Sequence, residues 1–454
     1  MSTASSNSKA TAAASTTSTA DSPHDVVCVG FGPAALSLAI ALYEQPRPLK
    51  VLFIERQPSF SWRGENFPMD RTSMRTNLLQ DLVTMRNPLS KFTFLNYLWS
   101  TDSLIAYTNL GQMNPPRLVF AKYLAWCASH MDAKGWTRYG QAVKDMEPMT
   151  KSNDDVELWK INVQDEKTGE AANPVFAKKV ILALGEQPKL PRALSGFQFN
   201  DRVLHSVDFM KTLPKLREWK GPSLNIAVVG GNDEAVEILE QCESYLDTAK
   251  VTLFLSDAAL RQTDENPFIG TLTAKSKGRN PGGDSTTVQR EALASLYTSQ
   301  YESRIRAERA GKEHLLDIQS STDVLGVEQA NDKIVLKLLD KAATGHSQPF
   351  DFVFLASGYE RGLQEDLVAP AKHLLDSRDG TISVDKDYKV MFRRGSMASE
   401  LGVWIMDAFS KGGDDTFPSV ALRSGMVAKS LLIASQPPKQ ERKVTQEPTE
   451  RAVL

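Results

Sequence analysis

The feature that most constrains this chain is a glycine turn set between a short apolar strand and an apolar helix, in residues 25–42. Gly30 permits the tight turn, Gly32 lets backbone N–H groups approach a pyrophosphate at the helix N-terminus, and the small Ala35 lets helix and strand pack closely. Glu55 ends the next strand-like run, 20 residues after Ala35, which is the spacing at which an acidic group meets ribose hydroxyls. The segment therefore predicts a dinucleotide site rather than a purely structural turn. Since a carboxylate repels a 2′-phosphate, FAD or NAD fits this site and NADP does not.

A second turn of the same kind lies near the middle of the chain, where a strand-like run leads into Gly230 and Gly231. Short β-branched runs alternate with helical patterns along the chain, at 26–29, 50–54, 179–182, 225–229, 250–255 and 351–355. Strands that alternate with helices and are flanked by glycines are typical of parallel α/β units. The predicted fold class is therefore α/β, with two Rossmann-like dinucleotide-binding domains.

Composition narrows what such a protein binds. Its 454 residues carry 53 Lys and Arg against 55 Asp and Glu, and this balance argues against nucleic acid as a partner because phosphate binding needs clustered cations. Cys28, Cys127 and Cys242 form no CxxC pair, which excludes a disulfide scaffold and a Cys-rich zinc site, and no metal is expected. A mean hydropathy of −0.31 and the lack of a long apolar run indicate a soluble, cytoplasmic protein with no membrane partner.

Both ends of the chain are predicted to be disordered tails. Residues 1–24 consist almost wholly of Ser, Thr and Ala up to Asp21, and they cannot bury enough apolar surface to offset the entropy of ordering. They have neither the apolar stretch of a secretory signal nor the arginines of a transit peptide. Residues 436–454 are charged and contain proline, and they form the second predicted tail.

Several further motifs follow the first turn. They are Ser59-Phe-Ser-Trp62, the long run from Thr72 to Leu98, Pro116-Arg117-Leu-Val-Phe-Ala-Lys-Tyr123-Leu-Ala-Trp126, Leu355-Ala-Ser-Gly358-Tyr359 and Gly412-Gly-Asp-Asp415-Thr416-Phe-Pro-Ser419. Over residues 25–435 the chain resembles the flavin-dependent N-hydroxylating monooxygenases, the ornithine and lysine N-monooxygenase family of hydroxamate siderophore biosynthesis. The stretch 80–98 is the most specific part of this resemblance.

The resemblance implies an FAD domain made of discontinuous pieces, with a nicotinamide-nucleotide domain inserted into it and a substrate site where the two meet. The implied boundaries are 25–205 for the first part of the FAD domain, 206–345 for the NAD(P)H domain, and 346–435 for the second part with a substrate-site segment. The implied FAD contacts are Gly30, Gly32, Pro33, Ala35, Glu55, Trp62, Arg63, Arg75, Val143, Thr416, Phe417 and Pro418. Phe92, Phe94 and Tyr97 are expected to pack in the core.

The second glycine turn departs from the family's pattern. It occupies the family's NADPH-binding turn, with contacts expected at Gly230, Gly231, Asn232, Asp233 and Glu234. The family has a third glycine in place of Asn232 and Gln-Ser in place of the two acids. Asn tolerates a positive φ angle, so the turn itself can persist. Two carboxylates suit the helix dipole, yet they would repel a pyrophosphate.

The ribose end of this second unit departs as well. Ser256 stands where the family uses an arginine for the 2′-phosphate of NADPH, which weakens selectivity for that phosphate. Arg261 or a nearby lysine is the alternative cation. The expected cofactors are therefore FAD together with either NADPH or NADH.

Three of the four substrate positions that the resemblance implies have changed. A lysine that anchors the substrate carboxylate is replaced by Gln80, an asparagine by Gly270, and a further asparagine falls near Asp284, while Ser419 is kept. Loss of a charge-assisted bond to a buried carboxylate costs on the order of 1.5–3 kcal/mol. A larger, peptide-derived amine is therefore favoured over free ornithine or lysine, unless a cation within 275–279 restores the anchor.

The activity implied is N-hydroxylation or N-oxidation of an amine by FAD, NAD(P)H and O2 through a flavin C4a-hydroperoxide, in secondary-metabolite or siderophore biosynthesis. Arg75 replaces a family glutamine beside the flavin and is the predicted catalytic residue, whereas His205 is expected to be structural. The alternatives are an L-ornithine N5-monooxygenase of siderophore biosynthesis, an FAD-dependent oxidase, and a non-catalytic paralogue with a degenerate nicotinamide site. Family analogy suggests a homotetramer.

Overall fold

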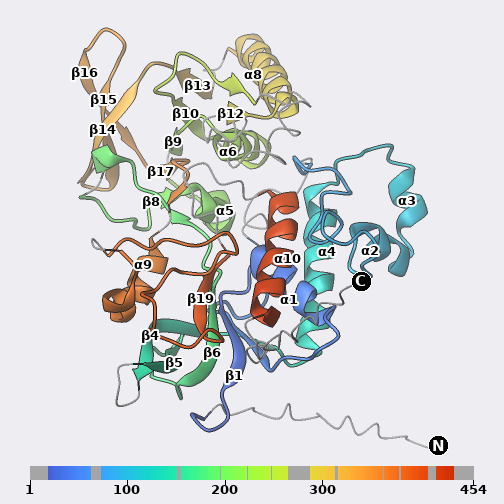
Figure 1. The fold of residues 1–454 in the computed structure, drawn as a ribbon. Helices are drawn as coiled ribbons and strands as arrows, with labels where there is room; N and C mark the ends of the chain where they lie inside the picture. The colour runs from blue at the N-terminus through green and yellow to red at the C-terminus, as the bar shows by residue number, and fades with distance from the viewer. Residues whose placement is uncertain are drawn as a thin grey trace, which may run out of the picture.

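The computed structural model describes residues 19–62, 73–150, 155–194, 196–221, 223–246, 248–263, 287–311, 315–360, 362–377, 380–406 and 416–433. These residues form two α/β domains, one above the other in Figure 1. The chain starts in the lower domain, passes to the upper one, and returns to the lower domain for its last strand and helix. The predicted fold class and the discontinuous first domain are confirmed.

The sheet of the lower domain has seven strands, in the order β3-β2-β1-β6-β5-β4 with β19 paired to β6. Strands β1, β2, β3, β6 and β19 are parallel, whereas β4 and β5 form an antiparallel edge. The bounds are β1 His24–Val29, β2 Val51–Ile54, β3 Thr137–Arg138, β4 Gln141–Thr150, β5 Val156–Asp165, β6 Val175–Leu182 and β19 Gly402–Ile405. The strand β19 comes from near the end of the chain, which makes this domain discontinuous.

Helix α1 (Pro33–Tyr43) lies at the centre of the lower domain. Its residues 35–42 are all buried, because the helix packs between the sheet and the two helices α4 (Arg117–Asp132) and α10 (Phe417–Ile433). A helix that is apolar on all sides requires such a doubly covered position. On the other face of the sheet, α9 (Leu363–Val368) and the 3-10 segment Ala369–Leu374 pack against β4.

Helices α2 (Phe94–Ser100) and α3 (Leu104–Thr108) form a lobe beside α4 in Figure 1. Phe92, Phe94 and Tyr97 are buried there among neighbouring aromatic rings, which confirms their expected role in the core.

The sheet of the upper domain has five parallel strands in the order β13-β10-β9-β17-β8. The bounds are β8 Val203–His205, β9 Asn225–Val229, β10 Lys250–Phe254, β13 Leu316–Gln319 and β17 Phe352–Leu355. One face shares a core with the helices α5 (Phe209–Arg217), α6 (Asp233–Tyr245) and α8 (Arg290–Ala310). The other face is covered by a small antiparallel sheet of β14 (Asp323–Ala330), β15 (Lys333–Leu339) and β16 (Gly345–Phe350).

Two strands correct the predicted domain boundaries. Strands β8 and β17 lie outside the predicted range 206–345, yet both pair within the upper sheet, so the prediction was wrong at both ends. The predicted tail 1–24 also runs too far, because His24 already pairs with Ala177 as the first residue of β1. The predicted tail 436–454 lies outside the described residues.

Two short strand pairs complete the fold. Where the chain crosses between the domains, β7 (Gln187–Pro188) and β18 (Tyr359–Glu360) pair antiparallel. In the upper domain, β11 (Arg261–Gln262) pairs in parallel with β12 (Thr287–Val288).

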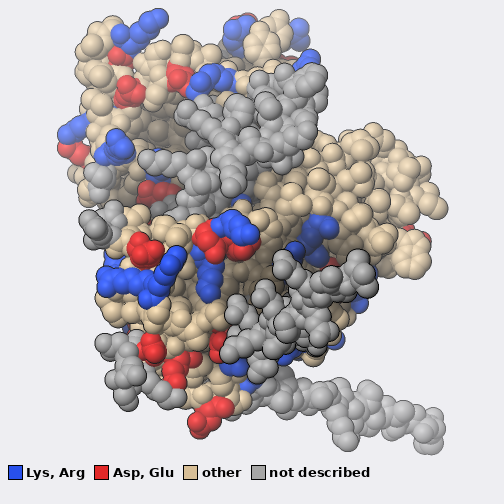
Figure 2. Space-filling view, in the orientation of Figure 1, with Lys and Arg blue, Asp and Glu red and all other residues tan. Residues whose placement is uncertain are grey.

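Cys28, Cys127 and Cys242 are buried free thiols. Within the described ranges, no helix is both long and apolar enough to cross a bilayer, and no group of three or more His, Cys, Asp or Glu side chains is placed to hold a metal ion. Figure 2 shows acidic and basic side chains interspersed over most of the viewed face, with few over the lobe of α2 and α3.

Candidate functional site

The two glycine turns share one backbone construction. Gly30 follows β1 with a φ of +93° and Gly230 follows β9 with a φ of +133°, which are values that L side chains rarely adopt. A Cβ added to Gly30 would lie 2.2 Å from the carbonyl oxygen of Ala183, and one added to Gly230 would lie 2.4 Å from that of Ala356. Ala183 and Ala356 follow β6 and β17, the parallel neighbours of β1 and β9. Both turns therefore need glycine for the same reason.

The first turn leaves open space in front of helix α1. Gly32 is the N-cap of α1, and a Cβ built on it would meet no atom of the described residues within 4 Å. Pro33 occupies the start of the helix, where the missing N–H costs no hydrogen bond, and Ala35 is fully buried. The first turn of a helix presents N–H groups that have no partner within the helix, and together with the helix dipole they suit an anion.

Glu55 lies beside this turn, at the carboxyl end of β2. Its Oε2 accepts the N–H of Phe31 at 2.7 Å, and its Oε1 accepts the N–H of Gln57 at 2.8 Å. The N–H of Gln141 donates to the carbonyl of Glu55 at 3.0 Å, which brings β4 and its residue Val143 to the same end of the sheet. Both carboxylate oxygens keep lone pairs for further donors, as the predicted ribose contact requires.

Aromatic side chains connect the other predicted FAD contacts. The ring of Trp62 lies 6.1 Å from that of Phe120 and 6.2 Å from that of Phe417, measured between ring centroids. Phe417 and Pro418 begin helix α10, which packs on α1, and Thr416 directly precedes them. Arg63 lies outside the described residues.

The second turn is filled by one of its own side chains. Asn232 is the N-cap of α6, as Gly32 is of α1, and it lies next to the half-buried Gly231. Its Oδ1 accepts the N–H of Ala235 at 3.1 Å, and its Nδ2 donates to the carbonyl of Ala356 at 3.2 Å. Its φ is −114°, so the turn persists through Gly230 and needs no positive φ at the asparagine.

The two acids after this cap have partners on neighbouring elements. Asp233 pairs with the guanidinium of Arg75. Glu234 accepts the hydroxyl of Ser206, and it accepts the phenol of Tyr359 at 2.9 Å. Negative charge is therefore held at the N-terminus of α6, where the first domain has open space.

The ribose end of the second unit carries an exposed ion pair. Ser256 and Asp257 follow β10, and a carboxylate oxygen of Asp257 lies 3.1 Å from a guanidinium nitrogen of Arg261, with both side chains about half exposed. Arg261, the alternative cation for the 2′-phosphate, thus lies at this end of the sheet, but the carboxylate of Asp257 already contacts its guanidinium.

Residues 22–361 match the family described as L-lysine 6-monooxygenase/L-ornithine 5-monooxygenase. The chain belongs to this family. It is 31% identical over 439 residues to the L-ornithine N(5)-monooxygenase of Ajellomyces capsulatus, a match that covers 91% of each chain.

Solved structures of family members have the same fold. The ornithine hydroxylase PvdA of Pseudomonas aeruginosa matches 91% of this chain and 100% of its own, with a TM-score of 0.80 and 25% identity. The ornithine N-hydroxylase KtzI of Kutzneria sp. 744, solved with reduced FAD, NADP+ and L-ornithine, matches with the same coverage, a TM-score of 0.80 and 26% identity. The family predicted from the motifs is confirmed, and with it the fold of two dinucleotide-binding domains.

The two turns fit the family's two nucleotides unequally. At the first turn, the open space at Gly32 and the fixed carboxylate of Glu55 fit the pyrophosphate and a ribose of FAD. At the second turn, Asn232 fills the corresponding space, and Asp233 and Glu234 add negative charge. A nicotinamide dinucleotide can therefore occupy the second turn only where these side chains move aside.

The predicted substrate positions are described in part. The Oε1 of Gln80 accepts the N–H of Asn77 at 3.0 Å, so this carboxamide oxygen is used within its own loop. The hydroxyl of Ser419 accepts that of Thr416 at 3.4 Å. Gly270 and Asp284 lie outside the described residues.

Asp81 is a residue that the sequence analysis missed. Its buried carboxylate accepts the N–H groups of Val83 at 2.8 Å, Thr84 at 2.6 Å and Phe94 at 2.6 Å. Burial raises the pKa of this carboxyl, and the hydrogen bonds oppose the rise. An acid inside an apolar run was the signal available in the sequence. Its bonds tie the start of the loop at 81–84 to the start of α2 at Phe94.

Arg75 and His205 both lie where the domains meet. Arg75 pairs with Asp233, and its predicted role beside the flavin stays a prediction. His205 is buried, its Nδ1 accepts the N–H of Val207 at 3.3 Å, and its Nε2 lies 2.9 Å from the carbonyl of Gly358. This histidine is structural, as expected.

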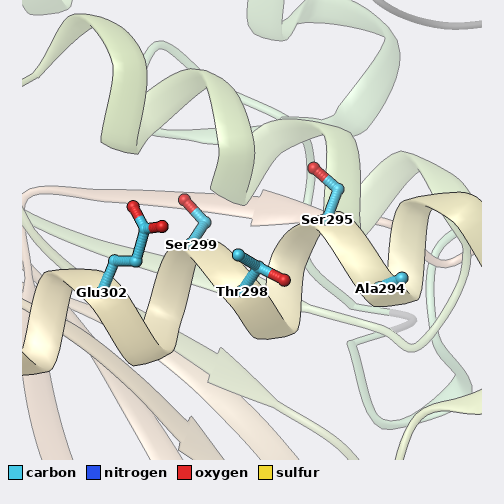
Figure 3. A pocket seen from close by; sticks show the side chains of 5 residues that line it. All are labelled: Ala294, Ser295, Thr298, Ser299 and Glu302. Atoms are coloured by element: carbon cyan, nitrogen blue, oxygen red, sulfur yellow. The ribbon is translucent and has the colours of Figure 1, made fainter.

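A shallow hollow of about 420 Å³ opens along helix α8, away from both glycine turns. Its lining side chains lie on one side of that helix in Figure 3 and are Ala294, Ser295, Thr298, Ser299 and Glu302. Ser299 donates to Glu243 on α6. The hollow contains no pair of groups suited to redox or acid-base chemistry.

Proposed function

We propose that this protein is an FAD-dependent monooxygenase that oxidises the nitrogen of an amine in the cytoplasm, in siderophore or other secondary-metabolite biosynthesis. One atom of O2 is transferred to the amine nitrogen, and the other leaves as water. NADPH or NADH supplies two electrons, and solvent supplies the remaining proton. FAD, when bound, supplies the oxygen-activating chemistry.

The observation that carries this proposal is the open first turn in a chain of the N-monooxygenase family. Gly32 leaves the helix end free and Glu55 is fixed beside it, so the chain retains the means to hold FAD. The buried ring of Phe120 packs against the partly buried ring of Phe417 at the start of α10, and we expect these apolar side chains to limit the access of water to the flavin. Exclusion of water favours transfer of oxygen to the amine over release of H2O2.

The proposed substrate is an amine whose carboxyl group is blocked, as in an amide or a peptide. Gln80 stands where the resemblance implies a carboxylate-anchoring lysine, and its remaining donor is a neutral NH2 group. A neutral donor suits an amide carbonyl, whereas a free carboxylate loses a charge-assisted bond worth on the order of 1.5–3 kcal/mol. The second candidate is N5-hydroxylation of free L-ornithine, which the 31% identity to the Ajellomyces capsulatus enzyme favours.

A comparison of L-ornithine with L-ornithinamide tests the proposal. Hydroxylamine, H2O2 and nucleotide oxidation are measured together with NADPH and with NADH. We expect more hydroxylamine per nucleotide oxidised with the amide, and we expect Gln80→Lys to reverse the preference. Efficient hydroxylation of ornithine by the unaltered protein would select the second candidate. Release of H2O2 on mixing with an amine in the absence of nucleotide would instead identify an oxidase, and lack of any turnover would identify a non-catalytic paralogue.

We also propose that the protein self-associates, with a homotetramer as the expected state. The lobe of α2 and α3 exposes large apolar side chains, among them Ile105 at 77% and Trp99 at 73%, and Leu89 in the loop before α2 is 92% exposed. Exposed apolar patches often mark protein interfaces, and we infer that these side chains form such a patch. The few charged side chains over the lobe in Figure 2 support the same assignment.

A further inference from the structure

The amino end of α6 lies where the upper domain meets the lower one (Figure 1), and two ion pairs cross the junction there. Arg75 of the lower domain pairs with Asp233, and Arg117, the first residue of α4, pairs with Glu237 one turn further along α6. The second pair is bidentate, with N–O distances of 3.0 and 2.8 Å, and its side chains are only 15% and 6% exposed. These two pairs are called the α6 clasp below.

The side chain of Asn232 occupies the same end of α6. The backbone equivalence of the two turns makes Asn232 the counterpart of Gly32, since each caps the helix that follows a left-handed glycine. At Gly32 no described residue comes within 4 Å of a Cβ position, whereas at Asn232 the side chain bonds both to the helix N–H of Ala235 and to the carbonyl of Ala356. The amide oxygen thus takes a bond that a phosphate oxygen would otherwise take.

Asp233 supplies the charge that a phosphate would bring. One of its oxygens accepts the N–H of Gln289 at 2.8 Å, the other pairs with Arg75, and its side chain is 18% exposed. It lies in the first turn of α6, where the helix dipole favours an anion. Asn232 thus bonds one N–H group of this helix end, and Asp233 places a carboxylate there, without any ligand.

We propose that Asn232, Asp233 and the α6 clasp act as a built-in competitor of the nicotinamide nucleotide. A dinucleotide reaches this turn only by displacing the Asn232 side chain and by separating Asp233 from Arg75, which loosens the contact between the domains. The inference rests on the proposed function in that a nicotinamide nucleotide is the electron donor. The affinity for a nicotinamide nucleotide is therefore lower than it would be with glycine at position 232 and a neutral residue at position 233.

The test is equilibrium binding of NADP+ and of NAD+ to the FAD-loaded, oxidised protein at fixed ionic strength, measured by calorimetry. Asn232→Gly opens the space and Asp233→Asn removes the charge while it keeps the shape. We expect each single variant to tighten binding and the double variant to tighten it by about tenfold or more, because a unit charge near a phosphate repels it strongly. The control is Glu291→Gln, which removes one negative charge from the first turn of α8, and we expect it to leave the affinity unchanged.

An equal affinity of the unaltered protein and of both correctly folded single variants would overturn the proposal, as would an equal gain with Glu291→Gln. Circular dichroism and the flavin absorbance show whether each variant is folded and loaded, and the two single variants keep the test valid if the double variant is unstable. Neither amine nor turnover enters this measurement. If the binding test overturns this inference, the proposal of N-oxidation still stands, because that proposal is tested by the hydroxylamine formed.

Discussion

Single replacements of Gly30 and Gly32 in the first turn should distinguish an effect on folding from an effect on FAD binding. In Gly30→Ala the new Cβ would lie 2.2 Å from the carbonyl oxygen of Ala183, in a backbone conformation with a φ of +93°. In Gly32→Ala the new Cβ would meet no atom within 4 Å among the residues that the structure describes, and the backbone has an ordinary φ of −80°. The first change strains the fold, whereas the second intrudes only on the space meant for the pyrophosphate.

The magnitudes follow from these contacts. A left-handed conformation costs an alanine about 1–2 kcal/mol, and overpacking against fixed backbone adds about 1–3 kcal/mol. Gly30→Ala should therefore lower the free energy of unfolding of the FAD-free protein by about 2–5 kcal/mol. Gly32→Ala should change it by less than about 0.5 kcal/mol, while it weakens FAD binding by about tenfold or more.

Urea unfolding with and without FAD measures both quantities. At an FAD concentration of about 100 times the Kd of the unaltered protein, bound FAD adds about 2.7 kcal/mol of stability, and a tenfold weaker variant gains only about 1.4 kcal/mol. Flavin fluorescence quenching gives the Kd directly. The reasoning is refuted if FAD-free Gly32→Ala is as unstable as Gly30→Ala, or if it binds FAD as tightly as the unaltered protein.

Two further predictions concern the domain junction and the α2–α3 lobe. Burial raises the pKa of Glu237 to about 7, and the ion pair with Arg117 limits this rise. Arg117→Met should therefore raise this pKa further and, near pH 8, destabilise the protein by about 3–5 kcal/mol. A carboxyl with a raised folded-state pKa loses stability as pH rises through that pKa, so the gap in Tm to the unaltered protein should widen from pH 6 to pH 8; a gap independent of pH would contradict the assignment. Trp99→Glu with Ile105→Glu should reduce the molar mass in light scattering without loss of FAD, and an unchanged mass would exclude this lobe as the interface.

Most of the fold could be predicted from the sequence because local patterns determine it. The glycine turns at Gly30 and Gly230, the apolar strands before them and the acid at Glu55 each follow from nearby residues. The pairing of Val203–His205 and Phe352–Leu355 in the upper sheet could not be predicted. A short apolar run indicates a strand but carries no information on which sheet it joins.

The sequence predicted the first glycine turn and its acid, but it did not predict how the side chains of the second turn are paired. The conflict between Asp233 and a pyrophosphate is visible in the sequence, but its resolution by Arg75 joins residues 158 positions apart. In the same way, the acceptance of the Tyr359 phenol by Glu234 depends on the junction of the domains. Contacts of this kind depend on the tertiary structure, which sequence spacing does not determine.

A single turnover of the reduced, FAD-loaded protein tests the central claim most directly. Dithionite reduces the flavin, excess reductant is removed, and the protein is mixed with O2 and L-ornithinamide, so that no nicotinamide nucleotide is needed. N-oxidation predicts close to one hydroxylamine for each flavin, with little H2O2. Formation of H2O2 alone, with ornithinamide and with ornithine alike, would contradict the assignment of this protein as an N-oxidising monooxygenase.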